Sequence, residues 1–286
     1  MNKAKIKRIT GTVIIAVLVV VVCVIGIIIS NTRIPDKLSP GAYRAVFFDV
    51  GEADCILFHG DGAVILTDAP ANETERLTGY MERMRIKQID YFIISHYDTD
   101  HAGDAVKIIN KFKPSHVLMP EPLENQRGIY NEIVKVTTEK QRITAKIGQR
   151  YNKGGVVIDI LAPNGKGTES NDMCIVCKIS YGDSSLLLCS DIDTDEEKVI
   201  LSKYGDKLKS DVLKVAHHGS RYSSSDAFIC TVSPDYAVIS CGQNTFGHPD
   251  IGVMDRLKAI KAEVLTTQQN GVIIFDFFSD SVVKVK

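Results

Sequence analysis

The sequence predicts a mixed α/β (α+β) domain in which β-sheets pack face to face and helices cover them from outside. Short β-type apolar runs outnumber helix-like segments along the 286-residue chain. Several of these runs precede the first helix-like segment of the domain, which suits packed sheets better than a strictly alternating parallel sheet. In addition, histidines and aspartates recur where the predicted strands end, which indicates that these ends share a site.

Each predicted element depends on a local pattern of apolar residues. Short runs of apolar and β-branched residues predict strands at residues 43–48, 55–58, 64–66, 91–94, 117–119, 156–161, 175–179, 186–188, 212–215, 237–239 and 272–277. Longer segments with apolar residues at helical spacing predict helices at residues 73–85, 104–112, 124–137, 194–204 and 252–261.

The N-terminal region predicts a membrane anchor. Residues 13–29 contain no polar side chain, and an apolar run of this length spans a bilayer. The run is longer than the centre of most signal peptides, which favours an uncleaved signal anchor at 9–30, with secretion after cleavage near its end as the alternative. Because four basic residues and no acidic one precede the run, residues 1–8 are expected in the cytoplasm and the domain at 42–286 outside it. A stalk is expected at 31–41.

Charge and cysteine content restrict the class of protein. The whole chain has a net charge of −1, and since its first eight residues carry four basic residues and no acidic one, the remainder has a net charge of −5. This argues against broad binding of duplex nucleic acid, which depends on neutralising phosphates. Six cysteines follow the apolar run, too few to indicate a disulfide-built scaffold. Cys174 and Cys177 have the spacing of a zinc knuckle, but without a second pair they indicate buried small side chains.

One loop carries the pattern of a metal site. Directly after the apolar run 91–94, two histidines and three aspartates occupy nine residues: His96, Asp98, Asp100, His101 and Asp104. Imidazole nitrogens and carboxylate oxygens are donors that zinc and manganese take in proteins. A solvated acidic loop is the alternative interpretation, but the alternation of the two residue types predicts metal binding.

Further donors stand at the ends of other predicted strands. Four more strands are each followed within a few residues by a histidine or an aspartate: Asp68, Asp191, His217, His218 and His248. Any one of them alone would be interpreted as a turn or capping residue. Together with the loop at 96–104, they indicate one site at the strand ends.

On these motifs, the chain resembles the metallo-β-lactamase superfamily, and within it the soluble hydrolase domain of ComEC-type DNA-uptake proteins. The resemblance extends from about residue 43 to the C-terminus, and its motifs lie at 47–54, 66–68, 95–103, 171–172, 190–191, 211–220 and 244–249. It implies a four-layer αββα sandwich over residues 42–286. It also implies two divalent metal ions, zinc or manganese, in a cleft at the sheet edges.

The resemblance further implies roles for the matched residues. Six of them match metal ligands: His96 and Asp98 for the first metal, Asp191 as the carboxylate that bridges both metals, and Asp100, His101 and His218 for the second metal. Asp98 stands where other members of the superfamily have a histidine.

The remaining matches surround these ligands. Asp68 matches a carboxylate that orients them. Asp100, His217 and His248 are the expected catalytic residues, with His217 and His248 as general acids or phosphate-binding groups. For His248, a histidine in a turn beside Pro249 is the alternative. No histidine lies between His116 and His217, so the middle histidine that completes the first metal site elsewhere is missing, and Asn171 or Asp172 occupies its region.

The expected function is that of a membrane-anchored, extracytoplasmic, metal-dependent hydrolase, a phosphodiesterase or nuclease acting through a metal-bound hydroxide. Single-stranded nucleic acid or a cell-surface phosphodiester polymer is the expected substrate, and the carboxylate-rich first site argues against a β-lactam. The alternative comes from another class: a non-catalytic or weakly catalytic metal-binding accessory protein of a DNA-uptake or envelope complex. The missing histidine motivates it, because the first metal would be held weakly.

Overall fold

Residues 34–163 and 168–286, together with Val17 and Val21, are described by the computed structural model. The expected basic tail, all of the expected membrane anchor except Val17 and Val21, and the first three residues of the expected stalk therefore lie outside the described residues. None of the helices that the structure describes is long and apolar enough to cross a membrane. Residues 36–286 form one compact unit.

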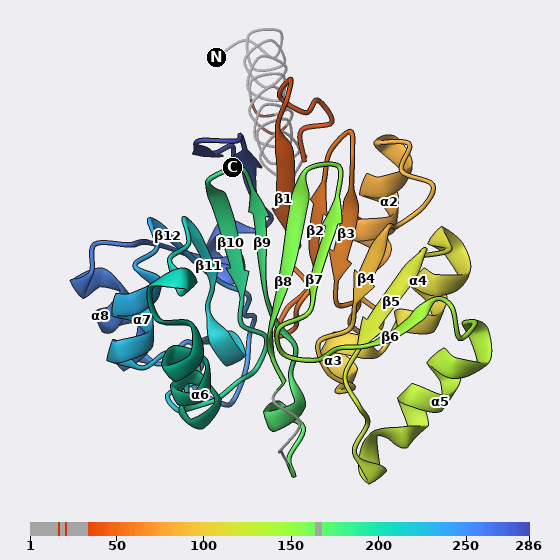
Figure 1. The fold of residues 1–286 in the computed structure, drawn as a ribbon. Coiled ribbons are helices and arrows are strands. Elements are labelled where there is room, and N and C mark those ends of the chain that lie inside the picture. Colours follow the sequence, from red (N-terminus) through yellow and green to blue (C-terminus); the bar gives the residue numbers. More distant parts are fainter. Residues whose placement is uncertain (1–16, 18–20, 22–33, 164–167) are drawn as a thin grey trace, which may run out of the picture. The chain divides into compact units, whose positions relative to one another are not determined.

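Two β-sheets face each other within this unit, as predicted, and helices lie on their outer sides (Figure 1). The first sheet has the strand order β15-β14-β1-β2-β3-β4-β5-β6, and it contains β1 (Tyr43–Phe47), β2 (Ile56–His59), β3 (Val64–Thr67), β4 (Tyr91–Ile93), β5 (His116–Met119), β6 (Arg142–Thr144), β14 (Ile273–Phe277) and β15 (Val282–Lys284). The second sheet has the order β13-β12-β11-β10-β9-β8-β7, and it contains β7 (Arg150–Lys153), β8 (Val156–Ala162), β9 (Val176–Tyr181), β10 (Ser184–Leu188), β11 (Val212–Lys214), β12 (Tyr236–Ile239) and β13 (Glu263–Thr266).

The covering helices are divided between the two sheets. In Figure 1, the first sheet is flanked by α2 (Glu75–Arg83), α4 (Ala105–Phe112) and α5 (Arg127–Val136). The second sheet is flanked by α6 (Thr194–Tyr204), α7 (Asp226–Val232) and α8 (Ile251–Ala259). The order of layers is therefore helix, sheet, sheet, helix.

Apolar side chains from both sheets fill the space between them. Phe47 and Ile93 of the first sheet share one buried cluster with Ile160 and Leu186 of the second. Burying a side chain of this size contributes about 1.5–3 kcal/mol. This apolar layer gives the two sheets a rigid relative position, and their edges can hold a site between them.

Parallel pairing brings the strand ends to common edges. In the first sheet β3 pairs parallel with β4, and in the second β10, β11 and β12 pair parallel with one another. The carboxyl ends of parallel neighbours lie at the same edge, where α/β proteins bind their ligands. The histidines and aspartates that follow these strands are thus brought together although they are far apart in sequence.

Several short elements were not predicted. Four of them are strands, β6, β7, β13 and β15, and each lies at one of the two edges of its sheet. An edge strand pairs on one side only and tolerates polar residues, as the sequence Arg-Tyr-Asn-Lys of β7 illustrates. Such strands form because a neighbour offers hydrogen-bond partners, and they lack an apolar run of their own. The unpredicted helices are short: α3 (Thr99–Ala102), α7 and α9 (Thr267–Asn270).

Candidate metal centre

Four side chains converge where the edges of the two sheets meet. Asp100 and His101 lie on α3, Asp191 follows β10, and His218 lies in η4 (Ala216–Gly219), the short turn after β11. Their ligand atoms lie within 4.8 Å of one another. The Asp191 Oδ2 atom is 3.4 Å from Nε2 of both histidines, and Asp100 Oδ2 is 3.6 and 3.7 Å from the same nitrogens. We call these four residues the ligand cluster.

The ligand cluster has the properties of a cation site. Three of its buried atoms have no hydrogen-bond partner among the described residues: His101 Nε2, His218 Nε2 and Asp191 Oδ1. Leaving a buried polar atom unsatisfied costs about 1–3 kcal/mol. A divalent cation would satisfy all three atoms at once, and two imidazoles with two carboxylates suit zinc or manganese. The residues present therefore fit a bound metal.

Contacts behind the imidazoles fix which ring nitrogen faces the cluster. His218 Nδ1 donates a hydrogen bond to the carbonyl oxygen of Ser240, at 2.8 Å. Because a carbonyl can only accept, Nδ1 carries the hydrogen and the neutral ring offers its Nε2 lone pair. His101 Nδ1 lies 2.9 Å from Asp68 Oδ2, and Asp68 is itself held by the backbone N–H of Ser95 at 2.7 Å. A carboxylate behind a histidine orients the ring and makes it a better ligand.

Several residues at the site have backbone conformations that side chains disfavour. Asp68, His217 and His218 have φ values of 62°, 49° and 52°, in the left-handed region. This conformation costs an L-residue roughly 1–2 kcal/mol and is concentrated at functional sites.

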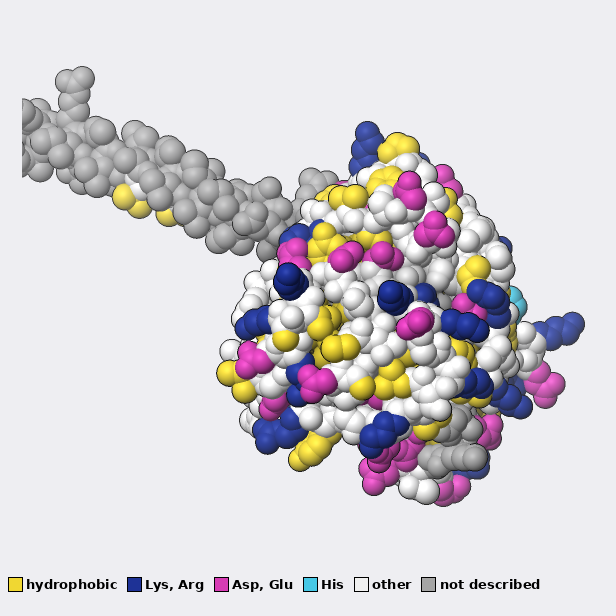
Figure 2. Space-filling view, turned by 60° about the vertical axis from the view of Figure 1, so that its left-hand side comes forward, with side chains coloured by type: hydrophobic (Ala, Val, Ile, Leu, Met, Phe, Trp, Pro, Cys, Tyr) yellow, Lys and Arg dark blue, Asp and Glu magenta, His cyan; other side chains and the backbone are white. Residues whose placement is uncertain are grey.

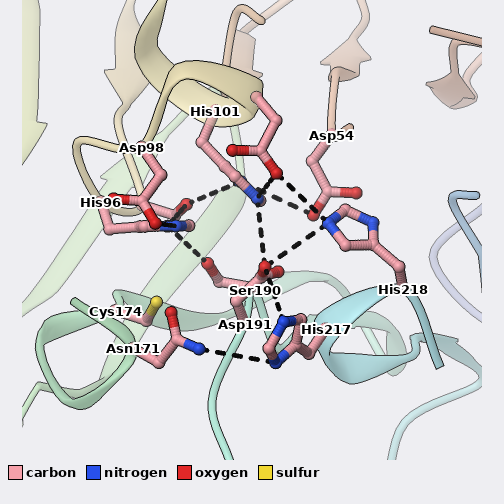
Figure 3. Close-up of polar contacts among 12 residues, drawn as sticks. Asp54, His96, Asp98, His101, Asn171, Cys174, Ser190, Asp191, His217 and His218 are labelled. Carbon is pink, nitrogen blue, oxygen red and sulfur yellow. Dashed lines mark hydrogen bonds and ion pairs between the residues drawn. The ribbon is translucent and has the colours of Figure 1, made fainter. Parts of the chain in front are cut away.

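The expected ligands of the first metal lie beside the ligand cluster (Figure 3). The ring of His96 is 4.1 Å from the ring of His101, and His96 Nε2 is 3.6 Å from Asp98 Oδ2. Asp98 also accepts a hydrogen bond from Ser170 Oγ at 2.7 Å. With the ligand cluster, His96 and Asp98 form a candidate two-metal site, whose first position has fewer converging donors than the second.

Asn171 is at the site, and its amide faces His217. Its Nδ2 lies 3.5 Å from Nδ1 of His217 (Figure 3). His217 in turn places Nε2 3.9 Å from Asp191 Oδ2, and burial lowers the pKa of its imidazole. The neighbouring Cys174 is fully buried, as expected for a small side chain.

His248 lines the outer wall of the site. Its ring centre is 5.6 Å from that of His217 and 6.3 Å from that of His218. Its Nδ1 is 2.8 Å from Glu52 Oε1, and the side chain of Asn244 holds the backbone N–H of His248 at 3.1 Å. These contacts of Glu52 and Asn244 hold the His248 imidazole and its loop in place. The sequence assigned no role to Glu52, because its partner lies 196 positions away.

Cavities adjoin the candidate centre, and two of them have similar volumes. One of about 490 Å³ is lined by residues that include Asp98, Asp100, Asn125 and Gln126. The other, of about 510 Å³, is lined by Gly242, Gln243, Asn244, Thr245, His248 and Gln268. Both are lined largely by polar residues, which suits a polar ligand.

Comparison with known proteins identifies the family. Residues 48–243 match the model of the metallo-beta-lactamase superfamily. The chain is 32% identical over 246 residues to Competence protein ComA of Neisseria gonorrhoeae, covering 84% of this chain and 33% of that protein. It is 30% identical over 253 residues to Recombination protein 2 of Haemophilus influenzae, covering 85% of this chain and 30% of that protein. The chain thus spans about a third of the length of these relatives.

The fold is also found among solved structures. The metallo-beta-lactamase fold protein YhfI of Bacillus subtilis superposes with a TM-score of 0.57 at 13% identity, covering 82% of this chain and 100% of that one. At this identity the likeness concerns the fold alone. Together with the matches above, it confirms the resemblance predicted from the motifs: the chain belongs to the metallo-β-lactamase superfamily and is related to competence proteins of the ComA and ComEC type.

Proposed function

We propose that this chain is a membrane-anchored phosphodiesterase or nuclease whose domain lies outside the cytoplasm. One observation carries the catalytic part of this proposal: Asp191, His101 and His218 direct buried, unpartnered atoms at one point beside Asp100. Metal-dependent hydrolysis is the general chemistry of the superfamily to which the chain belongs. The membrane anchor and its orientation are proposed from the apolar run and the basic residues before it.

The chain's own residues would divide the work of phosphodiester hydrolysis. Two divalent cations, when bound, would lower the pKa of a water to near neutrality and polarise the phosphoryl oxygens. Asp191 lies between the two histidines of the ligand cluster and suits a bridging carboxylate, while Asp68 and the Ser240 carbonyl keep His101 and His218 aimed at the site. His248, oriented by Glu52, would contact the leaving oxygen.

The rim of the site favours a single-stranded nucleic acid over a duplex. Phe246 and Tyr222 are each 71% exposed, on the loops that carry His248 and His218. The Phe246 ring is stacked on that of His248 at 5.7 Å, and exposed aromatic rings are platforms on which unpaired bases stack. Figure 2 shows acidic and basic side chains interspersed on one face of the domain, which does not suggest a broad duplex-binding surface there. The names of the relatives, a competence protein and a recombination protein, also support a nucleic acid. A cell-surface phosphodiester polymer is the other candidate.

The test is hydrolysis of bis-p-nitrophenyl phosphate by the purified full chain in detergent, with manganese or zinc added. We expect metal-dependent turnover that falls at least about 100-fold in Asp191→Ala and His101→Ala, because each variant loses a ligand. Asp195→Ala is the matched control, because Asp195 lies on the exposed side of α6 with its side chain 83% exposed. Turnover would justify comparing single-stranded DNA, RNA and wall polymers as substrates.

A second candidate function is a metal-binding accessory protein without strong catalysis. It is favoured by the composition of the tight cluster, which includes Asp100, His101, Asp191 and His218 but not His96 or Asp98. Metal content measured by mass spectrometry separates the two proposals. Bound metal without turnover on any phosphodiester would reject the phosphodiesterase and support the accessory protein.

A further inference from the structure

A buried lysine lies under the metal centre and belongs to none of the functions assigned so far. Lys214 is in β11 of the second sheet, and its side chain is 1% exposed. Its ammonium forms an ion pair with Asp54, which is 2% exposed and lies in the loop between β1 and β2 of the first sheet. The ion pair therefore connects the two sheets at the level of the candidate site.

Asp54 in turn contacts the segment that carries two of the ligands. Its backbone N–H donates to the carbonyl oxygen of Asp100 at 3.3 Å, and its Oδ2 is 3.9 Å from Nδ1 of His101. A shift of Asp54 would therefore displace Asp100 and His101 on α3. Lys214 of the second sheet is thus linked through Asp54 to Asp100 and His101, the ligands that follow the first sheet.

Negative charge is concentrated around this lysine. Five aspartates gather at the centre, three of them almost fully buried: Asp54, Asp68 and Asp191 buried, and Asp98 and Asp100 half-exposed. Burial opposes a charge on Lys214, but Asp54 and then Asp191 raise the pKa of its ammonium above the ordinary value, so the cation is retained. When metal is bound the histidine ligands are neutral, and one ammonium against five carboxylates then leaves four negative charges, which two divalent cations would balance.

We propose that Lys214 is a resident cation, a positioning residue that holds the two halves of the metal centre together before metal binds. The ligands come from both sheets, and in the metal-free protein their carboxylates repel one another across the gap. The Lys214–Asp54 ion pair opposes this repulsion. A second group of donors, Asp54, Asp68 and His101, also lies close enough to hold a metal. The Lys214 ammonium already supplies a cation to this group, so no second metal is needed there. The proposal depends on the metal centre and not on which ester is hydrolysed.

The test compares thermal unfolding of the full chain with chelator and with saturating manganese or zinc, for Lys214→Met and Asp54→Asn. Breaking a buried ion pair leaves one charge uncompensated, so both variants should lower the Tm of the metal-free protein by about 10 °C. Their responses to metal should differ in sign. Lys214→Met adds a net negative charge to the centre and should enlarge the rise in Tm on metal addition, whereas Asp54→Asn removes one and should reduce it.

Two further variants keep the test decisive. The double variant Lys214→Met/Asp54→Asn leaves neither charge unpaired and should recover most of the lost metal-free stability. Lys178→Met, at a partly buried lysine of β9 whose ammonium contacts the backbone carbonyl of Lys207 at 3.0 Å, is the matched control and should lower Tm equally with and without metal. Equal effects of Lys214→Met in both conditions, or metal responses of the same sign in the two single variants, would show an ordinary packing role. Because no turnover is measured, this result is independent of the phosphodiesterase assay.

Discussion

His101 and His218 illustrate how single residues prepare this site. Each ring has one nitrogen engaged, by Asp68 or by the Ser240 carbonyl, and the other directed at the ligand cluster. Outside the site, another histidine, His59, is also buried. It is 3% exposed at the end of β2, and its Nε2 lies 2.9 Å from the Tyr80 hydroxyl.

His59 leads to a prediction about pH and stability. Burial, and secondarily the charge of Arg44, lowers the pKa of its imidazole to about 4. In the unfolded chain the pKa is about 6.5, so below that pH the unfolded state binds a proton that the folded state does not take up. Stability is therefore lost as the pH falls from about 6.5 to 4, by about 2 kcal/mol between pH 7 and pH 5.

Urea unfolding at pH 7 and pH 5, with chelator present, measures this loss. His59→Gln should lose about 2 kcal/mol less than the unchanged protein over the same interval, because the group that titrates is gone. Taking the difference between the two proteins cancels the titration of the other histidines. The same loss in both would mean that His59 is not held neutral in the folded state.

At the scale of elements, α6 fastens the loop that follows the His217–His218 turn. Glu197 of α6 is fully buried, and its carboxylate accepts the backbone N–H of Ser224 and, at 2.9 Å, that of Ser225. Arg256 of α8 donates to the carbonyl of Ser224 at 2.8 Å from the other side. Two helices far apart in sequence thus hold one loop, and this loop follows the turn that carries the candidate ligand His218.

We expect Glu197→Ala to lower the free energy of unfolding by about 3 kcal/mol, because two buried backbone N–H groups lose a charged acceptor. Asp195→Ala on the exposed side of the same helix should change it by no more than about 0.5 kcal/mol. Urea denaturation of both variants provides the measurement. If the two variants are equally stable, α6 is not what holds this loop.

At the scale of the whole molecule, the metal centre is a property of two halves joined by one core. Asp100 and His101 come from the first sheet and Asp191 and His218 from the second, so neither half could hold a metal with all four. The proposed location outside the cytoplasm is also a property of the whole chain, because it depends on the N-terminal apolar run and not on the domain alone. An extracellular or periplasmic site would meet exogenous nucleic acid or surface polymers.

A fusion of alkaline phosphatase to the C-terminus tests this location. The enzyme needs its disulfides and is active only in an oxidising compartment outside the cytoplasm. We expect activity for the unchanged chain, because four basic residues precede the apolar run. Changing Lys3, Lys5, Lys7 and Arg8 to glutamate should reduce it by favouring the opposite orientation. An inactive fusion that accumulates to normal levels would place the domain in the cytoplasm.

The sequence by itself determined the layers of the fold and where most of the donors stand. Apolar runs mark strands such as β1 and β10 because their burial depends on local composition. The segment from His96 to His101 is recognisable because four donors share one loop. The edge strands β7 and β13 could not be predicted in this way, because they exist through pairing with a neighbour and carry little apolar signal of their own.

Only the tertiary structure decided which donors meet. It placed Asp100 and His101 against Asp191 and His218, left His96 and Asp98 beside them, and joined Glu52 to His248. It also paired Lys214 with Asp54, two residues 160 positions apart whose charges have no visible partner in their own segments. The physical reason is the range of the interactions: hydrophobic periodicity is read within a few residues, whereas electrostatic and ligand contacts depend on how two sheets are packed.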